Sequence, residues 1–197
     1  MSGLAKIQRL PRGLALQARR MLRDIRGVAA VEFAMVVPIM VVMMLGCVET
    51  SDALTVSSRM INISGAVADM VGRCSDVSTS DLKDIMRISD ALMGRYTSQP
   101  LNIQIVALQA DAQGAVTVSW SYDRHGNQPF AAGAPFPNLP FGLINTNGRL
   151  IVATANYRYH SPIGRYIHGT INLGHTAYGP ARNGIVNGPA GNKSCTF

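Results

Sequence analysis

Charged residues are scarce in this chain of 197 residues, since only 15% of them are Asp, Glu, Lys or Arg. The formal net charge is nevertheless +7, because residues 1–27 hold seven basic side chains and one acidic one. The rest of the chain holds 11 basic and 10 acidic side chains and is nearly neutral. A sequence-independent grip on phosphates needs many cations on one face. The body of the chain therefore does not have the composition of a nucleic-acid-binding protein.

Motifs that carry chemistry are also missing. No G-x-S-x-G, Walker A or C-x-x-C motif occurs, and no two histidines have the i, i+4 spacing of a helical zinc site. Acidic residues after the N-terminal region are dispersed, so a pair of catalytic carboxylates is not indicated. We expect no enzyme activity, no metal, no cofactor and no small-molecule substrate.

What the chain does contain is one long apolar run, Val28 to Val48, with Glu32 as its single ionisable residue. At 1.5 Å per residue, 21 residues reach roughly 30 Å, the thickness of the hydrocarbon core of a bilayer. The run predicts a transmembrane helix. A cleaved signal peptide would have a shorter apolar core and a small-x-small cleavage site, neither of which is found here.

Orientation follows from the flanking charges. The basic residues precede the span, whereas residues 49–59 are slightly acidic. The positive-inside rule then predicts a cytoplasmic N-terminus and a periplasmic C-terminal part, as in a single-pass protein of the bacterial inner membrane.

The segment Arg26 to Phe33 is the most informative one. A basic leader ends at Gly27, an apolar helix begins at Val28, and a lone carboxylate follows at Glu32. This arrangement resembles a prepilin-type processing site, at which a membrane peptidase cuts after the glycine. The resemblance to type IV pilins implies that Glu32 pairs with the new amine of Val28 in a neighbouring subunit. Alternatively, Glu32 lies at headgroup depth and only complements the positive N-terminal end of its helix.

A longer stretch, about residues 26–70, resembles the N-terminal signature of TadE-like proteins, which are pseudopilins of the tight-adherence (Flp/Tad) pilus. The resemblance implies a minor or accessory pilin that packs through its helix against other pilins and meets a prepilin peptidase. Two other interpretations stay open: an unprocessed TadG-like accessory protein of the inner membrane, and a signal-anchored periplasmic binding module or enzyme. The matching positions are Gly27, Glu32, Phe33, Pro38, Gly46 and Glu49.

The chain divides into five predicted parts. They are a basic cytoplasmic leader (1–27), the transmembrane helix (28–48), a helical extension (49–73), an α+β periplasmic domain (74–178) and a Gly/Asn-rich tail (179–197). The predicted fold class is α+β: the long helix continues into a pilin-like head with a short helix and a small antiparallel sheet.

Local patterns give the elements of the head. The extension is expected to bury a stripe of Leu54, Ile61, Val67 and Val71. A second helix starts with Ser80 as its N-cap and ends at Met93 before Gly94. Alternation predicts strands at 101–109, 115–122 and 149–158, a last strand broken at Gly174 (166–173 and 176–178), and a short helical turn at 139–144 in the loop 124–148.

The three cysteines have different predicted roles. Cys47 lies within the apolar span and is read as a small buried apolar residue. Cys74 and Cys195 both face an oxidising compartment if the topology is right, so a disulfide between them is expected, closing a loop worth about 4–5 kcal/mol. Among the aromatic residues, Phe136 and Phe141 are the candidates for an exposed interaction site.

Overall fold

The computed structural model describes residues 26–96, 101–160, 170–182, 187–189 and 195. The chain separates into two compact units, Met1–Val48 and Glu49–Phe197. Helix α2 (Arg26–Arg73) supplies residues to both. Its N-terminal part forms the first described unit, and its part from Glu49 onward belongs to the second unit, called the head below.

Helix α3 (Thr79–Met93) starts at a capping box. The Ser78 hydroxyl accepts the N–H of Asp81 at 3.2 Å, and the Asp81 carboxylate accepts the N–H of Ser78 at 2.9 Å. These two bonds satisfy backbone donors that have no partner inside the helix. The predicted N-cap Ser80 is therefore wrong by two residues. The predicted stop is confirmed, because Gly94 adopts φ +61° after Met93.

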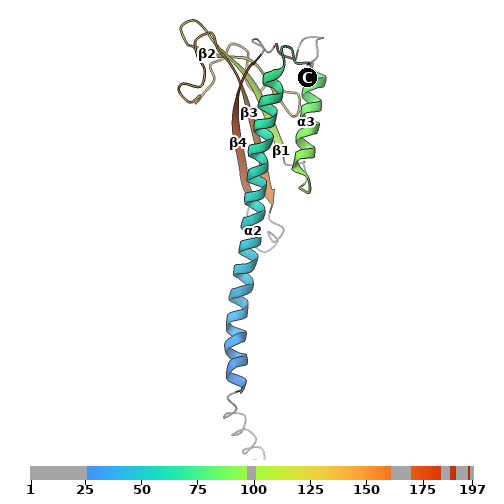
Figure 1. Ribbon diagram of the computed structural model, residues 1–197, viewed down its shortest axis with the longest axis vertical. Coiled ribbons are helices and arrows are strands. Elements are labelled where there is room, and N and C mark those ends of the chain that lie inside the picture. Colours follow the sequence, from blue (N-terminus) through green and yellow to red (C-terminus); the bar gives the residue numbers. More distant parts are fainter. Residues whose placement is uncertain (1–25, 97–100, 161–169, 183–186, 190–194, 196–197) are drawn as a thin grey trace, which may run out of the picture. The chain divides into compact units, whose positions relative to one another are not determined.

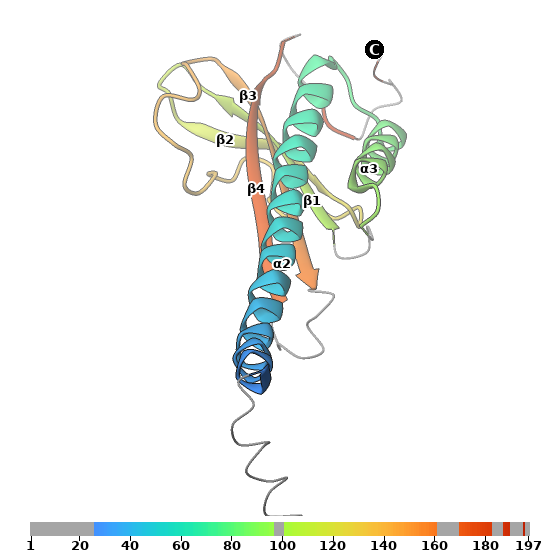
Figure 2. The same ribbon diagram turned by 60° about the horizontal axis from the view of Figure 1, so that its bottom comes forward.

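The head contains one antiparallel sheet with the strand order β2-β1-β3-β4. Its strands are β1 (Leu101–Ala110), β2 (Val116–Asp123), β3 (Arg149–His160) and β4 (Thr170–Pro180). The part of α2 in the head and α3 both cover one face of this sheet (Figures 1 and 2). The predicted α+β fold is confirmed.

Strand β4 corrects the predicted break at Gly174. It pairs with β3 without interruption from Thr170 to Pro180, and Gly174 lies opposite Asn156. A Cβ atom on Gly174 would approach the Asn156 amide oxygen to 2.3 Å, so the glycine makes room for a neighbouring side chain. The predicted strand residues 166–169 lie outside the described residues.

The loop between β2 and β3 contains no helical turn at 139–144. Leu139 and Ile144 instead pack on a second apolar cluster, on the sheet face away from the helices. Residues Val106, Val118 and Val152 belong to this cluster. Apolar anchors, and not local helical bonds, therefore hold the loop on the sheet.

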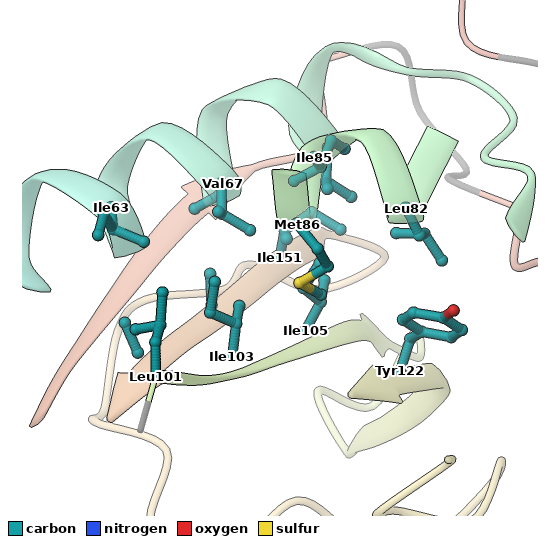
Figure 3. Close-up of a cluster of buried hydrophobic side chains, with 14 of the residues drawn as sticks. Ile63, Val67, Leu82, Ile85, Met86, Leu101, Ile103, Ile105, Tyr122 and Ile151 are labelled. Carbon is teal, nitrogen blue, oxygen red and sulfur yellow. The ribbon is translucent and has the colours of Figure 1, made fainter. Parts of the chain in front are cut away.

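The main core lies between the helices and the sheet (Figure 3). Ile63 and Val67 descend from α2, Ile85 and Met86 come from α3, and Ile103 rises from β1. Each of these side chains is at most 7% exposed. Burial of one such side chain contributes about 1.5–3 kcal/mol, which makes this cluster the main source of stability of the head.

The buried stripe of α2 differs from the predicted one. Val67 and Val71 are buried as expected, but Leu54 is 64% and Ile61 48% exposed. The core is instead reached by Val56, Met60 and Ile63. Apolar residues lie on more than one side of this helix, and the position of the sheet decides which side is covered.

Candidate helix-packing and processing site

The N-terminal part of α2 is an apolar helix whose side chains are exposed. In its most apolar 18-residue window the mean hydropathy is 2.5 and none of the window is buried. Phe33 is 68% and Met35 72% exposed. By length and composition this helix can cross a membrane, and it is the one such helix among the described residues.

Glu32 is the one acidic residue in this stretch, and its side chain is exposed. It lies one turn after Val28 on the same side of the helix, because residues four apart are neighbours on a helix surface. No salt bridge to Glu32 is formed by the side chains that the structure describes. A carboxylate inside hydrocarbon costs about 2.5–3.5 kcal/mol, so a cationic partner from outside the described part would stabilise it.

Gly27 and Gly46 have open space in the direction of a side chain. A Cβ atom at either position would meet nothing within 4 Å. The described part of the chain therefore does not itself require a residue without a side chain at these two positions.

Gly27 is the second residue of α2, so the predicted cut after it falls in the first helical turn. The first N–H groups of a helix have no partner within it, which makes this turn the easiest part of the helix to unwind. Pro38 lies further along, and α2 continues through it without a break.

Cys47 lies in the same apolar stretch and is exposed. No part of the head covers Cys47 among the described residues, so its prediction as a small apolar residue within the span stays a prediction. Cys47 shares the apolar stretch with Leu45 and Val48.

In the head, α2 packs very closely on β4. A Cβ atom on Gly179 would lie 3.1 Å from the backbone oxygen of Ala68, and one on Gly72 would lie 2.7 Å from the backbone oxygen of Pro180. Beside these contacts the hydroxyl of Ser64, which is fully buried, lies 2.9 Å from the Nδ1 atom of His175. Small residues thus allow the helix and strand backbones to approach each other.

A polar cluster begins at Glu49, directly after the apolar stretch. The hydroxyl of Tyr159 donates a hydrogen bond to Glu49 at 3.4 Å. Burial, and next the nearby Glu49 carboxylate, raise the pKa of Tyr159 to about 12. The phenol therefore stays protonated and remains a donor throughout the physiological pH range.

The same cluster joins α2 to the end of α3. Arg95 forms a salt bridge with Asp52, and the Tyr96 hydroxyl also donates to Asp52 at 3.1 Å. Arg59 lies over the Tyr96 ring at 5.4 Å and donates to the Leu92 carbonyl at 2.6 Å. This cluster was not predicted from the sequence, although the Arg95-Tyr96 pair directly after the helix stop at Gly94 is a visible signal.

A disulfide joins Cys74 to Cys195, with 5.2 Å between their Cα atoms. The backbone N–H of Cys195 also donates to the Asp81 carboxylate at 2.9 Å. Nearer the start of the tail, the N–H of Asn187 donates to the Ser75 carbonyl at 3.1 Å. The tail is therefore attached to the segment between α2 and α3.

The two aromatic candidates separate in the structure. Phe136 contacts Phe130 in a tilted arrangement, with 5.4 Å between ring centroids and 56° between ring planes, and packs on the second apolar cluster. Phe141 is completely exposed. Among the described residues, no group of three His, Cys, Asp or Glu side chains is placed to hold a metal ion.

Within the described residues, these features define a class: a protein with one exposed apolar helix long enough to span a membrane and an α+β head. Residues 27–69 match the family model described as TadE-like protein. The match confirms the resemblance inferred from the sequence. No curated protein and no solved structure matches the chain.

Proposed function

We propose that this chain is a pseudopilin that acts in Tad pilus assembly by packing its apolar helix against other pilins, and not by catalysis. It sits in the bacterial inner membrane with its N-terminus in the cytoplasm and its head in the periplasm. The observation that carries the proposal is the exposed apolar helix with one carboxylate, inside the segment that matches TadE-like proteins. The basic residues before Gly27 and the disulfide of the head support the orientation.

In this proposal the chain is cut after Gly27 by a prepilin peptidase. The new N-terminus is the amine of Val28, which is a cation at neutral pH. The Glu32 carboxylate of a neighbouring helix forms an ion pair with this ammonium group, which neutralises the carboxylate charge within the membrane. Pairing of this kind fixes the axial register of adjacent helices, whose contact is completed by Phe33, Pro38 and Gly46.

Processing is tested by mass spectrometry of the protein isolated from its native membrane. We expect the mature chain to start at Val28. A chain that starts at Met1 would instead assign the protein as an unprocessed, TadG-like accessory protein. Gly27→Leu is expected to block the cut, whereas Gly65→Leu is the control, because space is also open at Gly65.

Pairing is tested by recovery of the chain with partner pilins after cross-linking. We expect Glu32→Ala and Glu32→Gln to insert normally and to lose most of the cross-linked product, and Glu32→Asp to retain it. Val36→Ala, one turn later on the same side of the helix, serves as the matched control. Normal assembly of the Glu32→Ala chain would refute the pairing role.

Orientation is tested separately with a phosphatase reporter fused after Phe197. The reporter is active only in the periplasm, so high activity supports the proposal. A cytosolic reporter would refute the assignment to the pilus as well as the topology.

A further inference from the structure

The head contains a pocket of about 420 Å³ beside the first turn of α3. Three separate parts of the chain form it: α3, the end of β2 with the turn that follows it, and the tail at Pro189. Its lining holds three basic or imidazole side chains and no carboxylate among the described residues. The residues that line it are Thr79, Lys83, Tyr122, Arg124, His125, Gly126, Gln128 and Pro189.

Tyr122 is the most informative of these residues. Its side chain lies beneath Leu82 with the hydroxyl pointing away from Ile105 (Figure 3). The residue is only 6% exposed, and its hydroxyl lies 3.8 Å from the Cβ position of Gly126, which also lines the pocket. None of the described residues forms a hydrogen bond with this hydroxyl, and it is not among the buried polar atoms that lack a partner, so it is accessible from the pocket. An accessible hydroxyl without a protein partner is free to donate to a molecule in the pocket.

The charges around the pocket favour a ligand group that is negatively charged and accepts hydrogen bonds. Lys83 is exposed on the first turns of α3. Arg124 donates to both oxygens of Asp90, at 2.6 and 2.8 Å, and these two bonds leave its remaining N–H groups to point elsewhere. The carboxylate of Asp123 is already occupied by the N–H groups of His125 and Asn127.

We propose that this pocket binds an oxyanion group, a carboxylate or a phosphate, on a ligand of the head. Lys83 supplies the charge, and the hydroxyl of Tyr122 donates a hydrogen bond to an oxygen of the group. Remaining N–H groups of Arg124 and the ring of His125 complete the set of donors. This site is independent of the apolar helix, and it stands or falls separately from the proposed pilin role.

The chain contains a built-in reporter for this site. Trp120 is its single tryptophan, and Gly188 lies against the indole, since a Cβ atom on Gly188 would be 2.7 Å from the ring. Pro189, the next residue, lines the pocket, and its carbonyl accepts the hydroxyl of Thr79 at 3.2 Å. A ligand in the pocket therefore changes the surroundings of Trp120 through the 188–189 segment.

The experiment is a fluorescence titration of the full chain in a neutral detergent with sodium phosphate, with glucuronate and with glucose, at constant ionic strength. We expect a saturable change with phosphate or glucuronate and none with glucose. Saturation by phosphate alone assigns a phosphate ligand, and saturation by glucuronate alone assigns a carboxylate ligand.

Two variants test the residues. Lys83→Gln is expected to weaken binding about tenfold or more, and Tyr122→Phe, which removes only the hydroxyl, about threefold to tenfold. Arg87→Gln, at an exposed position on α3, is the matched control and should bind as the parent chain does. Circular dichroism and the emission maximum of the free variants establish that they are folded. Absence of saturation with both anions, or affinities unchanged in both variants, would overturn the proposal.

Discussion

Loss of the Cys74–Cys195 disulfide should strongly destabilise the head. The two cysteines are 121 residues apart in the sequence. In the chain-entropy model, a loop of this length restricts the unfolded chain by about 16 cal/mol/K, or about 5 kcal/mol at 25 °C. Domains have a total unfolding free energy of about 5–15 kcal/mol, so this one bond accounts for a large share of it.

The variant Cys74→Ala/Cys195→Ala is therefore expected to lower the midpoint of thermal unfolding by about 10–20 °C. Guanidinium unfolding in detergent, followed by the fluorescence of Trp120, gives the free energy directly. Trp120 is buried in the head and lies under the tail, so its emission reports on the relevant unit.

Cys47→Ala is the matched control, because Cys47 is a free thiol in the apolar stretch. It should leave the unfolding free energy of the head unchanged. A loss below about 1 kcal/mol in the double variant would show that the unfolded chain is not restricted by the bond, and it would refute the reasoning.

Three further predictions use the same unfolding assay. Ile63→Ala should lower the unfolding free energy by about 2–5 kcal/mol because Ile63 is fully buried. Ile61→Ala, on the exposed side of the helix, should change it by less than about 0.5 kcal/mol. Equal effects of the two substitutions would contradict the assigned core. Ser78→Ala should lower the unfolding free energy by about 1 kcal/mol through loss of the N-cap, and Ser80→Ala should lower it much less. A larger loss for Ser80→Ala than for Ser78→Ala would identify Ser80 as the cap. Burial raises the pKa of Asp81. Hydrogen bonds from Ser78 and from the N–H of Cys195 lower this pKa by more than burial raises it, so the pKa lies below the ordinary value. The stabilising effect of the Asp81 carboxylate is present above the unfolded pKa of about 3.9 and is lost as the pH falls through the folded pKa. The variant Asp81→Asn should therefore show a weaker dependence of the unfolding free energy on pH below about pH 4. The same pH dependence in Asp81→Asn as in the parent chain would contradict the role of this carboxylate.

Much of the fold could be predicted because its signals are local. The strand at 101–109 alternates buried and half-buried residues over its first half, and the strand Arg149–Arg158 alternates buried and more exposed residues over its second half, so a period of two is visible in the sequence. Asp111 and Gly114 mark the hairpin turn between β1 and β2, and the Gly114 N–H donates to the Asp111 carbonyl at 3.1 Å. Local turn chemistry of this kind needs no knowledge of the rest of the molecule.

Other features were missed because they depend on which parts of the chain meet. Ser78 and Ser80 are both chemically able to cap α3, and only the backbone geometry at Ser78 selects between them. The break predicted at Gly174 was wrong because the glycine accommodates Asn156, a neighbour in space and not in sequence. The candidate oxyanion pocket was not predicted either, since Lys83 and Tyr122 come from separate elements.

The amino-acid sequence by itself determined the apolar anchor, the lone carboxylate at Glu32 and the α+β class of the head. These properties depend on hydropathy, charge and periodicity within short stretches, which act before any tertiary contact forms. Tertiary structure alone decided which side of α2 faces the sheet and which distant residues share a pocket. The physical reason is that burial requires two surfaces in contact. Met60 and Ile61 are both apolar, and they differ in burial only because the sheet covers Met60 and leaves Ile61 exposed.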